Sequence, residues 1–173
     1  MKRAFALFLL VVSSAALAAP GDLASALAAL QPSQRGRINL YLLAVAGDGT
    51  QEVFRREVEF VRNQFDRDFG THGRSLALVN TRSAFSTAPP ATADNIREAL
   101  ATIAARMDRE NDILFLFMTS HGGKDHEFKL ALHAKELRGI KPRELAEMLD
   151  DSRIRWKVVL VSACYSGGFV DPL

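Results

Sequence analysis

The chain has 173 residues, of which 48% are hydrophobic, and its 22 basic and 20 acidic side chains give a formal net charge of +2. This length is enough for one domain with a substantial core. The chain has no basic stripe with interleaved aromatic residues, so its composition argues against nucleic-acid binding.

The N-terminus has the pattern of an export signal. Lys2 and Arg3 give a positive start, residues 4–12 form an apolar core, and Ala16-Leu17-Ala18 is a small-x-small cleavage site. The apolar run is too short to span a bilayer comfortably, so we expect residues 1–18 to be cleaved off, leaving no stable membrane anchor. The mature chain would be formally neutral, and we expect it in the periplasm or, alternatively, outside the cell or in a lumenal compartment.

The first regular elements follow a short lead-in. Residues 19–37 are rich first in Ala and Leu and then in Gln, Pro, Ser and Gly, which indicates a lead-in and a linker. Residues 38–46 predict an apolar strand that ends at the turn Gly47-Asp48-Gly49. Residues 51–69 carry apolar side chains at spacings of mostly three and four, which predicts a helix that ends near Gly70.

The rest of the chain continues to alternate strands with helices. We predict three further main strands, at residues 75–79, 112–119 and 157–163. Residues 127–133 predict one small strand or hairpin arm. Two further helices are expected at about residues 92–107 and 142–150. This alternation implies a mostly parallel sheet with helices on both faces, and active groups in such sheets lie at the carboxyl ends of strands.

His121 and Cys164 each follow a run of hydrophobic residues and precede a glycine-bearing turn. Both runs are predicted strands, so an imidazole and a thiol can meet at one edge of the sheet. A cysteine attacks as its thiolate, which a neighbouring imidazole can generate, and the imidazole can then protonate a leaving amine. A lone cysteine can also be an intermolecular bridge or a buried small side chain. Together with His121, however, it indicates a cysteine hydrolase.

Three nearby features have both a functional and a simpler interpretation. The backbone N–H groups of Gly122 and Cys164 could form an oxyanion site, whereas a glycine alone is most simply a tight turn. Asp48 could orient His121 or line the substrate cleft, although a turn-forming aspartate before Gly49 is the plainer explanation. Ser166-Gly167-Gly168 does not match the G-x-S-x-G elbow, which disfavours a serine hydrolase.

Two motifs of the chain resemble a known family. Thr119-Ser120-His121-Gly122 and Ala163-Cys164-x-Ser166-Gly167, each at the end of a predicted strand, resemble the catalytic core of the legumain-like cysteine peptidases. These form the peptidase C13 family, which is related more distantly to caspases, metacaspases and gingipains. Val45-Ala46-Gly47 resembles the start of the legumain domain, so the resemblance spans roughly residues 38–170.

The resemblance implies a caspase-like three-layer α/β fold over residues 38–173, with Cys164 as nucleophile and His121 as general acid/base. It places the family's oxyanion site on the backbone of Gly122 and Cys164. Counting without gaps from Ala46-Gly47, Arg55 falls where legumains carry an arginine that lines the pocket for the residue before the cut bond. A solvated helix arginine is the alternative for Arg55.

Two departures from the family bear on specificity and completeness. Ser162 stands where animal and plant legumains have a glutamate that contributes to asparagine recognition, so we do not expect an asparaginyl preference. The family continues past the position of Leu173 with further strands and helices. We therefore expect the fold to be incomplete at its C-terminus, with the strand at 157–163 poorly covered.

The sequence thus predicts an exported cysteine endopeptidase that hydrolyses peptides or proteins through a thioester at Cys164. A transamidase or peptide ligase is one alternative, because it would use the same two residues and differ only in the acyl acceptor. A non-catalytic interaction domain on the same scaffold is another. No cofactor is expected, and no metal, because His126, His133 and Asp125 fit no common zinc pattern. The sequence leaves the oligomeric state open.

Overall fold

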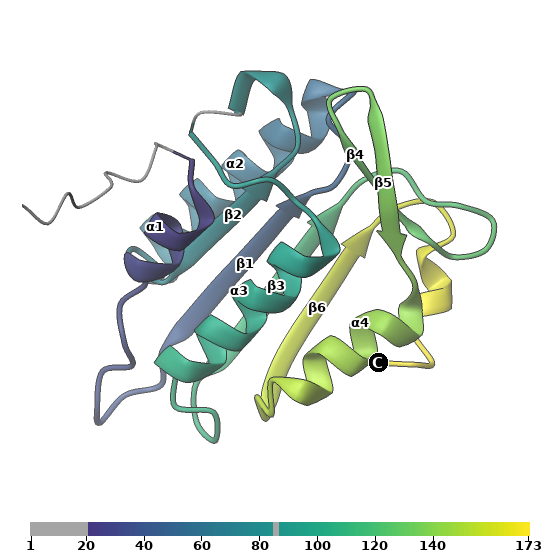
Figure 1. Ribbon diagram of the computed structural model, residues 1–173. Coiled ribbons are helices and arrows are strands. Elements are labelled where there is room, and N and C mark those ends of the chain that lie inside the picture. The colour runs from purple at the N-terminus through teal and green to yellow at the C-terminus, as the bar shows by residue number, and fades with distance from the viewer. Residues whose placement is uncertain (1–20, 85–86) are drawn as a thin grey trace, which may run out of the picture.

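A four-stranded parallel sheet with the order β2-β1-β3-β6 organises the molecule (Figure 1). Its strands are β1 (Leu40–Ala46), β2 (Ser75–Val79), β3 (Ile113–Thr119) and β6 (Trp156–Ser162). The computed structural model describes residues 21–84 and 87–173, so the expected signal peptide lies outside the described residues. The four main strands fall where the sequence predicts them, with boundaries shifted by one or two residues.

Helices cover both faces of this sheet and make the fold three-layered (Figure 1). Helix α2 (Glu52–Asp68) packs on one face through Phe54 and Val58. On the other face lie α1 (Leu23–Ala28), α3 (Ala93–Arg106) and α4 (Pro142–Asp151). This is the flanked, mostly parallel α/β arrangement of a caspase-like fold, as the sequence predicts.

The alternation of side chains along each strand divides the core into two clusters. On β1, Tyr41, Leu43 and Val45 face the cluster under α1, α3 and α4. The intervening Leu42, Ala44 and Ala46 face the cluster under α2. All six side chains are fully buried, as expected of a central strand in a parallel sheet covered on both sides.

Local sequence signals account for the helix starts. Thr92 caps α3 by accepting a hydrogen bond on its hydroxyl oxygen from the backbone N–H of Asn95, 3.1 Å away. Pro142 opens α4, where its missing N–H has no cost. Within the described residues, none of the helices combines the length and apolar character needed to cross a membrane.

A two-stranded antiparallel hairpin, β4 (Phe128–Leu132) and β5 (Lys135–Ile140), stands at the carboxyl edge of the main sheet (Figure 1). The sequence predicts its first arm at 127–133 and misses β5. The hairpin is joined to the main sheet by a parallel bridge between Asp48 and Ala131, which extends the line of β1 beyond Ala46. The end of β1 therefore meets β4 directly.

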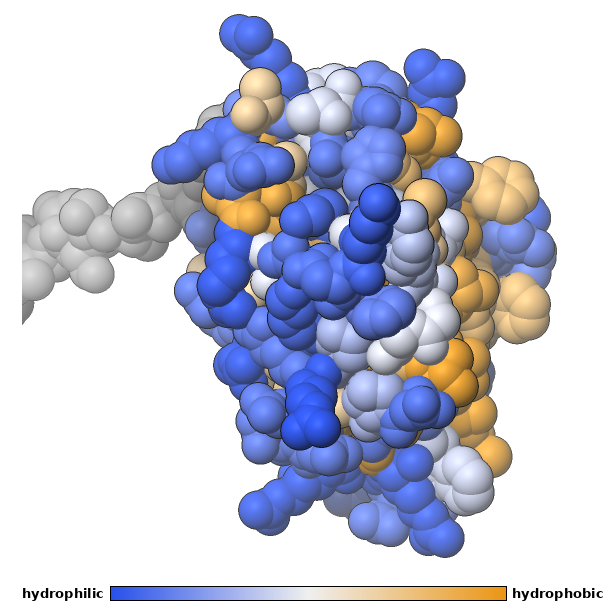
Figure 2. All heavy atoms as spheres, turned by 90° about the vertical axis from the view of Figure 1, so that its right-hand side faces the viewer, coloured by the Kyte–Doolittle hydropathy of each residue, from blue (hydrophilic) through white to orange (hydrophobic). Residues whose placement is uncertain are grey.

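Strand β6 is an edge of the main sheet, and its side chains alternate between exposed and half-buried. Trp156, Val158 and Leu160 alternate along it and are 51%, 47% and 44% exposed. Figure 2 views the molecule from this edge and shows hydrophobic surface gathered along one margin. The poor cover expected for this strand is therefore present within the described residues.

Asn80, directly after β2, ties together the segments at the carboxyl edge of the sheet. Its buried side chain donates from Nδ2 to the carbonyl oxygens of Gly47 (2.7 Å) and Ala91 (2.8 Å). Its Oδ1 accepts from the N–H of Ala91 at 2.8 Å. Its own backbone carbonyl accepts from the N–H of His133, between β4 and β5, at 3.1 Å. One amide thus holds the turn after β1 and the approach to α3.

We predict that Asn80→Ala lowers the free energy of unfolding by about 2–4 kcal/mol, because it leaves buried backbone groups of Gly47 and Ala91 without their partner. Chemical denaturation followed by circular dichroism measures the change. The control is Asn63→Ala on the exposed face of α2, which should shift stability by less than about 0.5 kcal/mol. Equal stabilities for the two variants would contradict the role assigned to Asn80.

Candidate active site

The pairing of β3 with β6 brings His121 and Cys164 to the same edge of the sheet. The two strands run parallel with Thr119 opposite Ser162, and the N–H of Ser120 donates to the carbonyl of Ser162 at 3.2 Å. His121 and Cys164 each lie two residues beyond this pair. Because neighbouring strands are about 4.8 Å apart, equal offsets on adjacent strands place the two residues side by side.

Both side chains also line one open depression beneath the N-terminal end of α2. The depression is walled by residues at the start of α2 and floored by the ends of β3 and β6; they are Gln51, Val53, Phe54, Glu57, Thr119, Ser120, His121, Ser162, Ala163 and Cys164. The thiol of Cys164 is free and exposed. An imidazole and a thiol in one solvent-accessible hollow are the arrangement that thiolate chemistry requires.

The N-cap residue of α2 and one residue of the helix itself contact His121. The Nε2 atom of the Gln51 side chain lies 3.0 Å from Nε2 of the His121 ring. The ring of Phe54 packs on the imidazole at 84° with the centroids 5.1 Å apart, an edge-to-face contact. The imidazole is therefore held on one side by an amide and on another by a buried aromatic ring.

The backbone after β3 packs directly on the backbone of the candidate nucleophile. A Cβ atom placed on Gly122 would lie 1.8 Å from the carbonyl oxygen of Cys164 and 3.1 Å from its nitrogen. Only glycine permits so close an approach of two backbones. Glycine at position 122, which the sequence offered as an oxyanion donor or a tight turn, is therefore also required by its contact with Cys164.

Of the residues expected to bind substrate, Ser162 lines the depression, whereas Arg55 and Asp48 do not. The guanidinium of Arg55 pairs with Glu52 at 2.6 Å and with Glu59 at 2.5 Å along α2. These hydrogen bonds raise the pKa of Arg55. The hydrogen bond from Arg55 is also the main cause that lowers the pKa of Glu52. The Arg55 guanidinium is thus held by two carboxylates of its own helix, with its side chain 25% exposed.

Asp48 takes the simpler of its two interpretations. Its Oδ1 accepts a hydrogen bond from the backbone N–H of Thr50 at 2.7 Å and a second one from the Thr50 hydroxyl. A carboxylate that bonds the N–H two residues on forms an Asx turn, which here leads from β1 to α2.

Glu57 is a member of the depression that the sequence did not single out. It is the only acidic residue among those lining the hollow, and its carboxylate accepts a hydrogen bond from the Thr119 hydroxyl at 2.5 Å. Gln51 and Phe54 were also missed as site residues. The helical periodicity placed Phe54 on a buried stripe, but nothing in the local pattern indicated that this stripe ends over His121.

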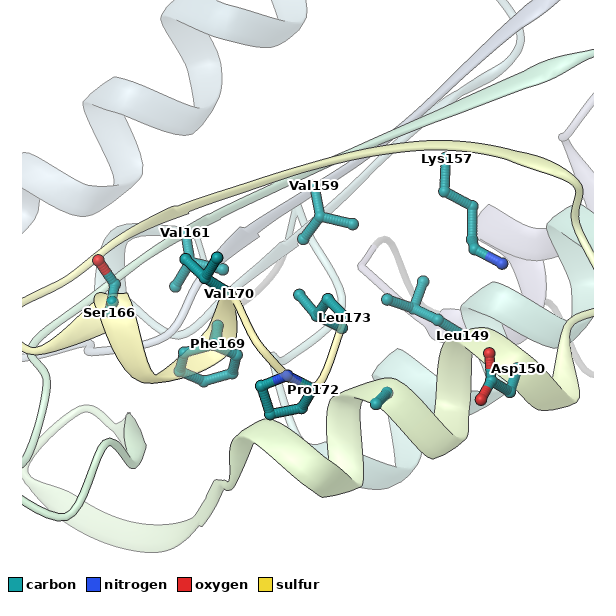
Figure 3. A pocket seen from close by; sticks show the side chains of 12 residues that line it. Leu149, Asp150, Lys157, Val159, Val161, Ser166, Phe169, Val170, Pro172 and Leu173 are labelled. Carbon is teal, nitrogen blue, oxygen red and sulfur yellow. The ribbon is translucent and has the colours of Figure 1, made fainter.

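No group of three or more His, Cys, Asp or Glu side chains is placed to hold a metal ion within residues 21–84 and 87–173. A second hollow lies between β6, α4 and the last residues of the chain (Figure 3). It is walled mainly by apolar side chains, among them Leu149, Val159, Val161 and Phe169. It contains neither His121 nor Cys164, so the depression under α2 is the candidate active site.

The model of the peptidase C13 family matches residues 92–173. The match covers β3 with His121 and β6 with Cys164, and begins after β1 and α2, which the sequence resemblance had included. No curated protein matches the chain. The match supports a cysteine peptidase at the level of the family. It supports a legumain-like C13 family assignment for the chain.

We predict that Gly122→Ala destabilises the fold by about 2–3 kcal/mol, because the new methyl group would overlap the Cys164 carbonyl and force the two strand ends apart. Gly167→Ala is the matched control, since a Cβ there would meet no atom within 4 Å. Urea denaturation of the two variants measures the difference. Similar midpoints for both would contradict the close backbone contact.

Proposed function

We propose that the protein is a cysteine endopeptidase in which Cys164 is the nucleophile and His121 the general acid and base. The observation that carries the proposal is the β3–β6 register, which sets the two residues at equal offsets on neighbouring strands. Their shared depression supports it, as does the C13 match, which favours peptide or protein substrates.

The proposed reaction is acyl transfer through a thioester. The Cys164 thiolate attacks the carbonyl carbon of the peptide bond, so that a C–S bond forms and charge moves onto the carbonyl oxygen, which the N–H groups of Gly122 and Cys164 would stabilise. The C–N bond then breaks, and the imidazolium of His121 gives its proton to the leaving amine. A water molecule, losing a proton to His121, hydrolyses the thioester and releases the acid and the thiol.

Gln51 fits this cycle as a positioning residue for His121. Its amide carries both a donor and an acceptor, so a half-turn of the amide lets it bond Nε2 whether or not that nitrogen bears a proton. The other ring nitrogen, Nδ1, is then left to exchange a proton with the thiol or the substrate. Phe54 limits rotation of the ring from the side.

The wider setting of this activity follows from the sequence. We propose that residues 1–18 direct export to the periplasm and that residues 38–173 form the peptidase domain, preceded by the lead-in 19–37. Mass spectrometry of the protein isolated from cell fractions tests the export and the cleavage. A periplasmic product that begins at residue 19 is the expected result, and an intact N-terminus in the cytoplasm would contradict it.

We predict that Cys164→Ala abolishes peptide hydrolysis and that His121→Ala slows alkylation of Cys164 by iodoacetamide at pH 7 by about tenfold or more, because thiolate formation loses its base. His72→Ala, at an exposed turn, is the histidine control. Equal alkylation of the wild-type and His121→Ala proteins would indicate a merely exposed thiol and argue for a non-catalytic domain.

The acyl acceptor separates a hydrolase from a transamidase in the same assay. A peptide substrate is incubated with the protein in the presence of a primary amine such as hydroxylamine or a glycine peptide, and the products are weighed by mass spectrometry. Free acid as the main product is expected. A product dominated by the new amide would assign the chain as a transamidase.

We predict that Gln51→Ala lowers kcat of peptide hydrolysis by about tenfold with little change in KM, because the imidazole is held less well while the substrate surface is largely kept. Gln64→Ala, further along α2, is the matched control and should retain wild-type kinetics. A Gln51→Ala enzyme with unchanged kcat would show that Gln51 does not position the ring.

A further inference from the structure

The loop after His121 touches the turn after Cys164 at a second place, through His126. Nδ1 of the His126 ring lies 2.8 Å from the backbone carbonyl oxygen of Tyr165. Tyr165 directly follows the candidate nucleophile. Because a carbonyl oxygen only accepts, this contact requires Nδ1 to carry the proton and to donate it.

Both ends of this hydrogen bond have unusual backbone conformations. His126 has φ 63° and Tyr165 has φ 58°, in the left-handed region. For residues other than glycine this region costs on the order of 1 kcal/mol, and it persists where surrounding contacts enforce it. The bond therefore joins two strained turns, one following each of the two candidate catalytic residues.

The ring also lies against the backbone of the second turn. A Cβ atom on Gly168 would be 2.2 Å from Cγ and 2.5 Å from Nδ1 of His126, so only glycine leaves room for the imidazole there. Gly168 belongs to the short 3-10 helix Ser166–Phe169 that follows Tyr165. The ring thus fills the space between the loop after β3 and the segment that carries the turn after Cys164.

We propose that His126 is a positioning residue for Cys164. By donating to the Tyr165 carbonyl and packing on Gly168, it fixes the turn that aims the thiol toward His121. The inference rests on the proposed function, in which Cys164 is the nucleophile. It assigns no chemical step to His126, which holds the backbone next to the sulfur and not the substrate.

Other contacts hold the loop itself in place, so removing the His126 ring should leave the loop folded. Gly123 donates to the Glu127 carbonyl at 2.9 Å, His126 donates its backbone N–H to the Gly123 carbonyl at 2.9 Å, and Gly122 forms a bridge with Phe128. The charged neighbours are engaged elsewhere, Asp125 with Lys141 and Glu127 with Lys129. The hydrogen bond from Lys141 is the main cause that lowers the pKa of Asp125.

Replacing the ring while keeping or removing its donor tests the inference. His126→Ala loses both the donor and the packing, whereas His126→Asn keeps an amide N–H close to the position of Nδ1 and tolerates positive φ well. We expect His126→Ala to slow alkylation of Cys164 by iodoacetamide at pH 7 about tenfold and to lower kcat for peptide hydrolysis with little change in KM. We expect His126→Asn to restore at least half of both rates. His72→Ala serves as the unaffected histidine control.

Each outcome decides the matter. Wild-type rates in His126→Ala would overturn the inference, and so would equally slow His126→Ala and His126→Asn proteins, since the donor would then be irrelevant. If His126→Ala does not fold, Gly168→Ala replaces it, because its new methyl group displaces the ring; wild-type rates in that variant would overturn the inference. His121→Ala is measured in parallel. If Cys164 is alkylated at the wild-type rate in His121→Ala, the proposed function itself is wrong. If alkylation is slow in His121→Ala but at the wild-type rate in His126→Ala, only the role of His126 is wrong.

Discussion

The parallel ladder between β3 and β6 is the constraint on which the rest of the site depends. Its register places Thr119 opposite Ser162, and His121 and Cys164 each follow this pair by two residues. A slip of one residue would turn one of the two side chains to the opposite face of the sheet, since successive residues on a strand point to opposite sides. The imidazole and the thiol share a hollow only in the observed register.

The residues around this ladder reinforce the register at close range. Gly122 lies on the Cys164 carbonyl with no space for a side chain, and His126 reaches across to Tyr165. On the opposite side α2 brings Gln51 and Phe54 onto the imidazole. The site is thus assembled from three stretches of the chain that are far apart in sequence, which is typical of sites at the carboxyl edge of α/β sheets.

Much of the fold could be predicted because its signals are local. Continuous apolar runs identified β1, β3 and β6, and the spacing of apolar residues identified α2. Strand β5 escaped because Lys-Glu-Leu-Arg-Gly-Ile has no alternating apolar pattern, and its first four residues are not buried. It is a strand because β4 offers it hydrogen-bond partners, which is information that the segment itself does not contain.

The site was predictable to a different extent. His121 and Cys164 stand out because each follows a predicted strand. The parallel pairing of these two strands then brings their ends to the same edge of the sheet. Arg55 was carried over by ungapped counting, which cannot tell that Glu52 and Glu59 lie on the same side of its helix and take its guanidinium. The sequence did not indicate Gln51 or Glu57, because their contact with the strand ends depends on how α2 is placed over the sheet.

The strand order has a consequence for the order in which the site is assembled. In the sheet β3 sits between β1 and β6, although β6 is the last of the four strands along the chain. Strands β1, β2 and β3 precede β6 along the chain and can pair with one another before the segment that carries Cys164 joins them. Cys164 then meets His121 only when β6 pairs with β3, so the depression that the two residues share is completed late in folding.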